Sequence, residues 1–242
     1  MKAISEFLLV AAAFAVSACS NKNVEPECPV VPESGLLPNQ FAAGTAATKM
    51  AIDSEWKLSW EQSDRVSVYD GSSSVEFHPT VFGGSKTVLE AEGFEADGSK
   101  TYYAVYPASA VKEFSGSSVT IEIDRDRSAS AGAFPSAPAV GSTAGDVRSF
   151  DFANVCGLVS FNITEDDIAS VVLFGGAGED IAGTVTVNAS TGVLSNVADG
   201  GEESIMLTPA SGSAFGSGGG AGHPAVFYKE RGGTGLLPGR PA

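Results

Sequence analysis

A cysteine near the start of the chain has the sequence context of a lipid acceptor. Cys19 follows Val16-Ser17-Ala18, which ends an apolar run that begins at residue 7. A short apolar segment that closes with small residues before a cysteine is typical of a bacterial lipoprotein signal, whose cysteine thiol becomes acylated, for example with palmitate. The run is too short to span a bilayer as a stable helix, so a cleaved signal peptide over residues 1–18 is favoured over a transmembrane anchor. The alternative is a chance Ala-Cys pair behind an ordinary secretory signal.

The other chemistry-bearing side chains form no recognisable metal or nucleophile pattern. His78 and His223 are the only histidines, and neither has the spacing of a zinc ligand set. Asp124-Arg125-Asp126 lacks the glycine and the distal glutamate of a calcium loop. The glycine-rich run at 216–220 is not followed by Lys-Ser/Thr, and no Gly-x-Ser-x-Gly elbow occurs. The sequence therefore predicts a protein without enzymatic activity, metal or cofactor.

Two kinds of side chain could act on sugars or bind them. Carboxylate pairs of the sort that glycosidases use occur at Glu165 with Asp167 and at Glu179 with Asp180. Both pairs lie among turn residues, where acidic side chains are ordinary. Aromatic rings that could stack on sugars are those of Tyr102, Tyr103 and Tyr106. On a strand, however, alternation divides neighbouring aromatics between the core and the surface.

Composition excludes some partners and leaves one cysteine question open. The 242 residues carry a formal net charge of −15, so the chain has no means of neutralising nucleic-acid phosphates. Outside the signal, Cys28 and Cys156 remain, and in an oxidising compartment they could pair. Cys28 lies in a proline-rich stretch, whereas Cys156 begins an apolar segment. The interpretation of Cys156 as a small buried apolar residue is therefore favoured over a disulfide.

The elements that position these residues are short strands. Apolar and polar residues alternate in segments such as 65–69, 101–106 and 119–123, and turn residues separate them. We find no amphipathic pattern longer than about two helical turns, so we predict an all-β, sandwich-like fold. Residues 19–44, with four prolines, are predicted to be an extended tether, and residues 128–145 a long connection.

Composition also suggests a division of the chain. Residues 45–148 are predicted to form an N-terminal β-sandwich domain, and residues 149–210 a second, incomplete or truncated β domain. Residues 211–242 begin with a run of Gly, Ser and Ala that cannot supply a core, which predicts a flexible tail. Within this tail only Ala225-Val226-Phe227-Tyr228 has the pattern of a strand.

An ordered set of motifs resembles the fimbrillin family of Bacteroidetes fimbrial subunits and related lipoproteins. The lipid-acceptor motif at Cys19 comes first. The other carriers are Thr48-Lys49-Met50-Ala51-Ile52, Leu58 to Tyr69, Tyr102-Tyr103-Ala104-Val105-Tyr106-Pro107, Gly132-Ala133-Phe134-Pro135 with Pro138-Ala139-Val140, and the segment from Phe152 to Phe161. Their order and spacing resemble those of the family from about residue 45 to residue 187.

The resemblance implies one or two transthyretin-like β-sandwich domains and a lipid anchor in the outer membrane that holds the protein at the cell surface. In family members that polymerise, proteolysis after a basic residue removes an N-terminal strand, and a strand from another fimbrial subunit fills the groove. This chain departs from that pattern, because no arginine lies between Cys19 and Arg65. Lys49 is therefore the candidate processing site, although it could be an ordinary surface lysine.

Two functions follow from these observations. The first is a structural or adhesive fimbrial subunit, or an anchor, that assembles by β-strand exchange and contacts a host ligand. The second is a glycan-binding surface lipoprotein associated with nutrient uptake, which would need exposed, coplanar aromatic side chains. Without a cut between Cys19 and the first strand, the lipid stays attached, and the chain would be an anchor rather than a repeating shaft subunit.

Overall fold

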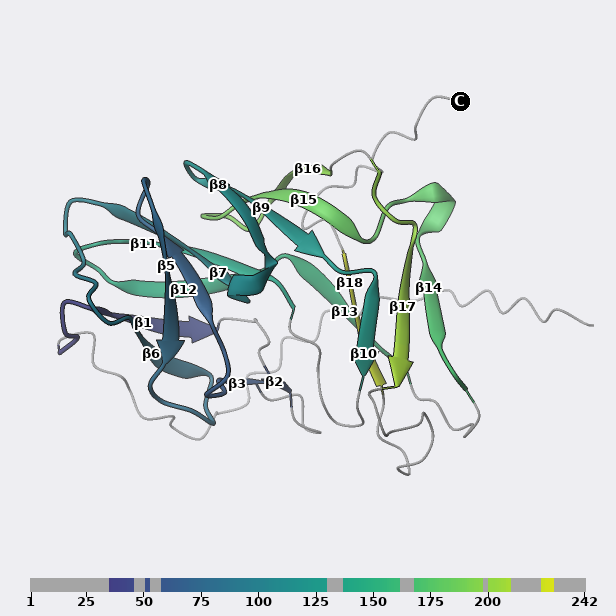
Figure 1. Ribbon diagram of the computed structural model, residues 1–242, viewed down its shortest axis with the longest axis horizontal. Helices are drawn as coiled ribbons and strands as arrows, with labels where there is room; N and C mark the ends of the chain where they lie inside the picture. The colour runs from purple at the N-terminus through teal and green to yellow at the C-terminus, as the bar shows by residue number, and fades with distance from the viewer. Residues whose placement is uncertain are drawn as a thin grey trace, which may run out of the picture.

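The computed structural model describes residues 35–45, 51–52, 58–129, 137–161, 168–197, 200–209 and 223–228. Within them the protein consists of strands and two short 3-10 turns, η1 (Ala108–Ala110) and η2 (Gly176–Gly178), without an α-helix. The all-β prediction is confirmed. Seven strands form the first half of the molecule, at the left of Figure 1: β1 (Gln40–Thr45), β4 (Val66–Tyr69), β5 (Ser74–Pro79), β6 (Lys86–Glu90), β7 (Thr101–Tyr106), β11 (Ala139–Ala144) and β12 (Ser149–Asn154).

These seven strands form a closed ring in the order β1-β12-β11-β7-β4-β5-β6. The ring consists of two layers, β6-β1 and β4-β7-β11. Strands β5 and β12 join them, because each pairs with one strand of either layer. All the pairs are antiparallel except β1 with β12, which is parallel. A small hairpin of β2 (Ala51–Ile52) and β3 (Leu58–Ser59) follows β1 in the chain.

The interior of the ring is rich in aromatic side chains. Alternation along each strand directs one set of residues inward, as in β4, where Val66 and Val68 are fully buried. Trp60 is 1% exposed and packs edge-on against Tyr106 and Phe152, with ring centroids 6.0 and 6.1 Å apart. The remaining buried members of this first core are Phe41, Ala43, Phe77, Leu89, Ala91, Tyr102, Ala104, Ala139 and Phe150.

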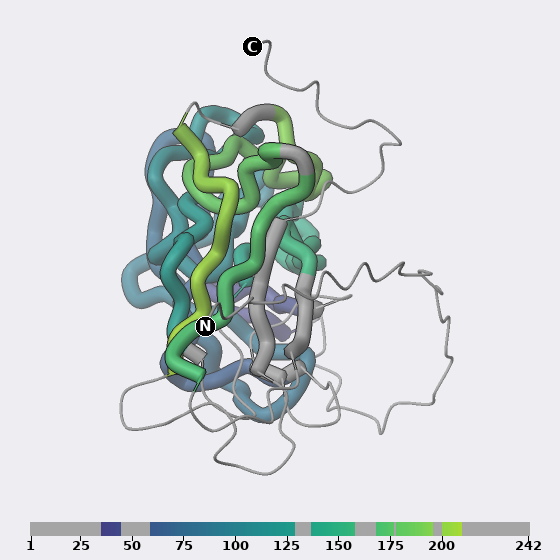
Figure 2. Tube along the Cα trace, turned by 90° about the vertical axis from the view of Figure 1, so that its right-hand side faces the viewer, coloured from purple at the N-terminus to yellow at the C-terminus, as the bar shows by residue number. Residues whose placement is uncertain are grey.

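The second half of the molecule contains three smaller sheets. Their orders are β16-β15-β9-β8, β10-β17-β14 and β13-β18. In Figure 2, β14 and β17 run side by side, as their antiparallel register requires. The strands are β8 (Val111–Ser115), β9 (Ser118–Ile123), β10 (Asp126–Ala129), β13 (Cys156–Phe161), β14 (Val171–Phe174), β15 (Gly183–Asn188), β16 (Leu194–Val197), β17 (Ser204–Pro209) and β18 (His223–Tyr228).

One layer of the ring contributes to both halves of the molecule. On β7, Tyr102, Ala104 and Tyr106 face the first core, whereas Tyr103 and Val105 face a second core formed with β9, β15 and β17. Tyr69 of β4 likewise stacks on Phe114 of β8, with ring centroids 4.8 Å apart and planes 10° apart. Because a strand presents successive side chains to opposite faces, one layer can be buried on both sides. The two halves are therefore packed together through the layer β4-β7-β11.

Several expected boundaries differ from this arrangement. The tether predicted to continue to residue 44 is wrong at its end, because β1 begins at Gln40 and Phe41 is fully buried. The connection predicted for 128–145 contains the whole of β11, a strand paired on both edges. The division at 148/149 does not separate the two cores, since β12 completes the ring while β9 pairs with β15. Within the predicted tail, β18 pairs with β13.

Candidate functional site

The two site residues that the sequence singles out lie outside the described residues. These are Cys19, the predicted lipid acceptor, and Lys49, the candidate processing site. Lys49 falls in the five-residue segment between β1 and β2, so β1 is the last described element before it. A cut after Lys49 would therefore separate β1, with everything before it, from the rest of the chain.

The side chains considered for catalysis or metal binding do not converge. His78 is exposed on β5, and His223 begins β18. Among the described residues there is no group of three or more His, Cys, Asp or Glu side chains that could hold a metal ion. Glu179 and Asp180 follow η2, and Glu165 and Asp167 lie outside the described residues.

The three tyrosines do not form a binding platform. Tyr102 and Tyr106 are 1% and 3% exposed inside the first core, and Tyr103 packs against the second core. The hydroxyl of Tyr106 donates a hydrogen bond of 2.9 Å to Oδ1 of the buried Asp64. Burial and the neighbouring carboxylate raise the pKa of this tyrosine. The sequence predicted that alternation would divide these tyrosines between the core and the surface. The structure divides them between two cores instead.

The most distinctive arrangement in the structure is the position of β1 between β6 and β12. Residues 40–44 pair antiparallel with β6, and residues 42–45 pair parallel with β12. On its outer face, Nε2 of Gln40 donates a hydrogen bond of 2.6 Å to Oε2 of Glu90. We name the space that β1 fills between β6 and β12 the β1 slot. Without β1, β6 and β12 would each lose a partner and the ring would open.

Phe41 is the main apolar contact of β1 inside the slot. Its side chain is fully buried, and its ring centroid lies 5.1 Å from those of Tyr102 and Phe150 and 5.5 Å from that of Phe77. Aromatic pairs at this spacing add to the free energy gained from area burial. Two positions on, Ala43 faces the same interior and is 2% exposed. The slot thus holds one large and one small side chain.

The turn before β12 fixes the start of β1. Arg148 has a left-handed backbone with φ 53°, which is uncommon for a residue other than glycine. Its carbonyl accepts a hydrogen bond of 2.9 Å from the amide of Ala42, and its guanidinium Nη1 donates one of 2.8 Å to the carbonyl of Leu37. The carbonyl of Pro38 accepts a further bond of 2.8 Å from the amide of Ala96. These contacts hold the strand in register at its amino end.

At another end of the ring, an ion pair joins Lys100 to the turn at Asp70. Nζ of Lys100 lies 2.6 Å from Oδ2 of Asp70, and Oδ1 of Asp70 accepts hydrogen bonds from the amides of Ser72 and Ser73. Gly71 has φ 95°, as expected for the Asp-Gly pair that ends β4. Lys100 first, and then the two amides, hold the pKa of Asp70 well below its usual range.

The Asp70 turn predicts a pH dependence of stability. A carboxyl group whose pKa is lower in the folded state stabilises the fold above its unfolded pKa, about 4 for aspartate, and this contribution is lost as the pH falls through the folded value. We expect the difference in unfolding free energy between wild type and Asp70→Asn to be largest at neutral pH and to shrink below about pH 4. Urea unfolding across this range measures it, with Glu92→Gln, an exposed change of the same charge, as the control. An equal difference at all pH values would contradict the prediction.

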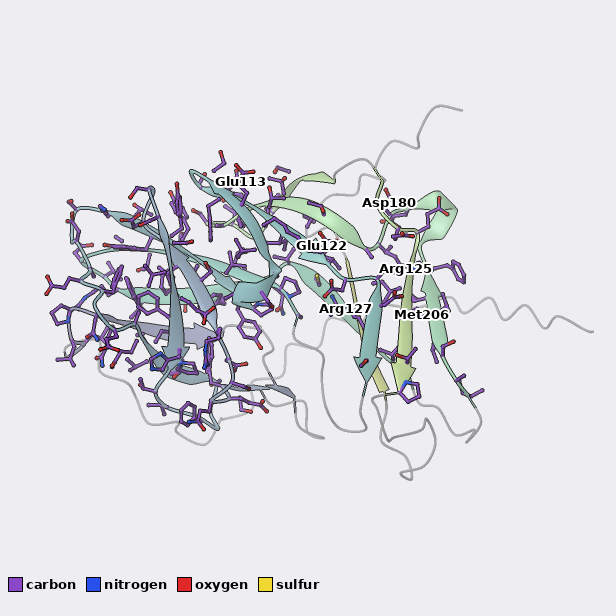
Figure 3. All side chains as sticks on the ribbon, viewed as in Figure 1. Glu113, Glu122, Arg125, Arg127, Asp180 and Met206 are labelled. Carbon is purple, nitrogen blue, oxygen red and sulfur yellow. The ribbon has the colours of Figure 1, made fainter. Side chains whose placement is uncertain are left out.

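Cys156 begins β13 with a free thiol and is 8% exposed within the second core. Its interpretation as a small buried residue is confirmed. Burial raises the pKa of the Cys156 thiol to about 12, and Arg127 of β10 opposes this increase. Figure 3 shows Arg127 on the side of β10 that faces β13. The thiolate is the reactive form, so the native thiol should be inert near neutral pH.

We expect a thiol reagent at pH 8 to label Cys156 at least ~100-fold more slowly in the native protein than in urea. The measurement is time-resolved labelling followed by peptide mapping, which reads Cys156 separately from Cys28. The solvent-exposed positions Ser72→Cys and Ser99→Cys serve as controls for a reactive thiol. Rapid labelling of native Cys156 would mean that the second core opens locally.

Comparisons with known proteins do not assign the chain to a family: no family profile, characterised protein or solved structure matches it. Helices long and apolar enough to cross a membrane are absent from the described ranges.

Proposed function

We propose that the chain is a surface lipoprotein of the fimbrillin type, a structural subunit or anchor that assembles by β-strand exchange. The observation that carries this proposal is the position of β1. It is the first described strand of the chain, it completes the ring through pairs on both edges, and Lys49 lies in the short segment between β1 and β2. A strand with these three properties can be replaced by one from another subunit without rearrangement of the remaining strands.

The geometry of the ring supports such an exchange. Loss of β1 leaves the facing edges of β6 and β12 about 10 Å apart, which is the width of one strand between two neighbours. Backbone amides and carbonyls on both edges then lack partners, and this is costly unless another strand supplies them. The second core lies against the layer β4-β7-β11, on which β1 does not pair. It therefore supports the open ring while the slot is empty.

The test combines processing with assembly. Mass spectrometry of the mature protein from its native membrane is expected to find an acylated Cys19 in the unprocessed form and a cut after Lys49 in the assembling form. Native gels should then show a ladder of oligomers that Lys49→Gln abolishes. Lys22→Gln is the matched control, because a cut after Lys22 leaves β1 attached to the chain.

Two results would overturn the proposal. An unmodified Cys19 in a mature chain with a different start would remove the lipid anchor. Saturable binding of a polysaccharide by an intact monomer, with no oligomers after proteolysis, would favour a glycan-binding lipoprotein. For that second function, the predicted tyrosine platform is not available, because Tyr102 and Tyr106 are buried.

A further inference from the structure

The contacts of β1 define a side-chain pattern that a replacement strand has to satisfy. At position 41 an aromatic ring meets four others, since Phe94 also lies 5.8 Å away between ring centroids. At position 43 the side chain is a single methyl group in the same closed interior. At position 42, on the opposite face, Ala42 is only 8% exposed. At position 44, which is half-buried, a Cβ would make an ordinary contact of 3.7 Å with Oδ1 of Asp151, so this position sets no tight size limit.

From this geometry, and resting on the proposed function, we infer that the β1 slot selects its partner strand by size. The strand has an aromatic residue at the position of Phe41, followed by two residues no larger than serine at the buried positions 42 and 43. A smaller residue at the first position leaves a cavity among the four rings. A larger residue at the position of Ala43 overpacks a closed core. The partner is thus an extended segment of aromatic–small–small sequence from a neighbouring subunit.

The chain itself offers a positive and a negative example of this pattern. Phe215-Gly216-Ser217-Gly218 repeats the order of Phe41-Ala42-Ala43-Gly44, with every small residue in place. In contrast, 223–228 has Pro224, which cannot donate a backbone hydrogen bond, and large side chains after position 225. Peptides of 211–221 and 222–229 should therefore behave differently, although both come from the same end of the chain.

The experiment uses the full chain with a protease recognition sequence inserted after Lys49, so that a defined cut frees β1 to exchange. Fluorescent peptides are then added, and their binding is followed by polarisation. We expect the peptide 36–46 to enter the slot, Phe41→Ala in that peptide to weaken binding by at least ~100-fold, and Ala43→Leu by at least ~10-fold. The 211–221 peptide should bind and lose binding with Phe215→Ala, and the 222–229 peptide should not bind.

The outcomes separate this inference from the proposed function. If the 36–46 peptide binds and its Phe41→Ala and Ala43→Leu forms bind equally well, exchange stands and selection by size is wrong. Binding of 222–229, or failure of 211–221 while 36–46 binds, would likewise overturn the selection pattern. If the 36–46 peptide itself does not bind to the cut chain, strand exchange at this slot fails, and the inference fails with it.

Discussion

Phe41→Ala is expected to lower the unfolding free energy by about 3–5 kcal/mol, the usual cost of removing a fully buried aromatic ring. The cost should lie at the upper end of this range, because the ring touches Phe77, Tyr102 and Phe150 at centroid distances of 5.1–5.5 Å. These side chains belong to three different strands and cannot all collapse into the vacated space. Urea unfolding followed by circular dichroism measures the change.

Leu37→Ala is the matched control for this experiment. Leu37 precedes β1 and is 56% exposed, and its carbonyl keeps the hydrogen bond from Arg148 after the substitution. We expect its effect to stay within about 0.5 kcal/mol. Equal, small effects of the two substitutions would show that β1 contributes little to the ring, and this result would also weaken the case for a closed slot.

The position of β1 was not predictable from its sequence. Gln40-Phe41-Ala42-Ala43-Gly44-Thr45 has one large apolar residue, and alanine and glycine have low strand propensity. The prolines before it favoured a tether that extended through the segment. The strand forms because β6 and β12 supply its backbone partners and four aromatic rings surround Phe41. Propensity is here overridden by tertiary packing, and a lone phenylalanine among small residues was the only signal.

Strand β11 escaped prediction for a related reason. Its sequence, Ala139-Val140-Gly141-Ser142-Thr143-Ala144, has the composition of a loop, yet it pairs with β7 and β12. In contrast, β9 was predictable, because Val119, Ile121 and Ile123 alternate with polar residues. The pairing of β9 with β15 was not, since even the nearest paired residues, Ile123 and Gly183, lie 60 positions apart in the chain and local patterns do not encode partners. The sequence therefore allowed strands with large β-branched residues to be predicted. It did not allow prediction of strands made of small residues or of which strands pair with each other.

The second large effect concerns the coupling of the two cores. Ile121→Ala is expected to lower the unfolding free energy by about 2–5 kcal/mol, because Ile121 is fully buried in the second core. Thr120→Ala is its control on the opposite face of β9, where the Thr120 hydroxyl lies 3.5 Å from that of Thr186. We expect Thr120→Ala to change the unfolding free energy by no more than about 1 kcal/mol.

In the Ile121→Ala variant, the fluorescence of Trp60 can report whether the two cores unfold together. Trp60 is buried in the first core, and Trp56→Phe would make it the only tryptophan, so its fluorescence follows the ring while circular dichroism follows all strands. The cores share the layer β4-β7-β11, in which Val105 and Val140 face the second core and Ala104 and Ala139 face the first. Loss of one core therefore exposes the back of the other. We expect Ile121→Ala to shift both transitions to the same lower urea concentration, whereas an unchanged fluorescence transition would mean that the ring folds independently of the second core.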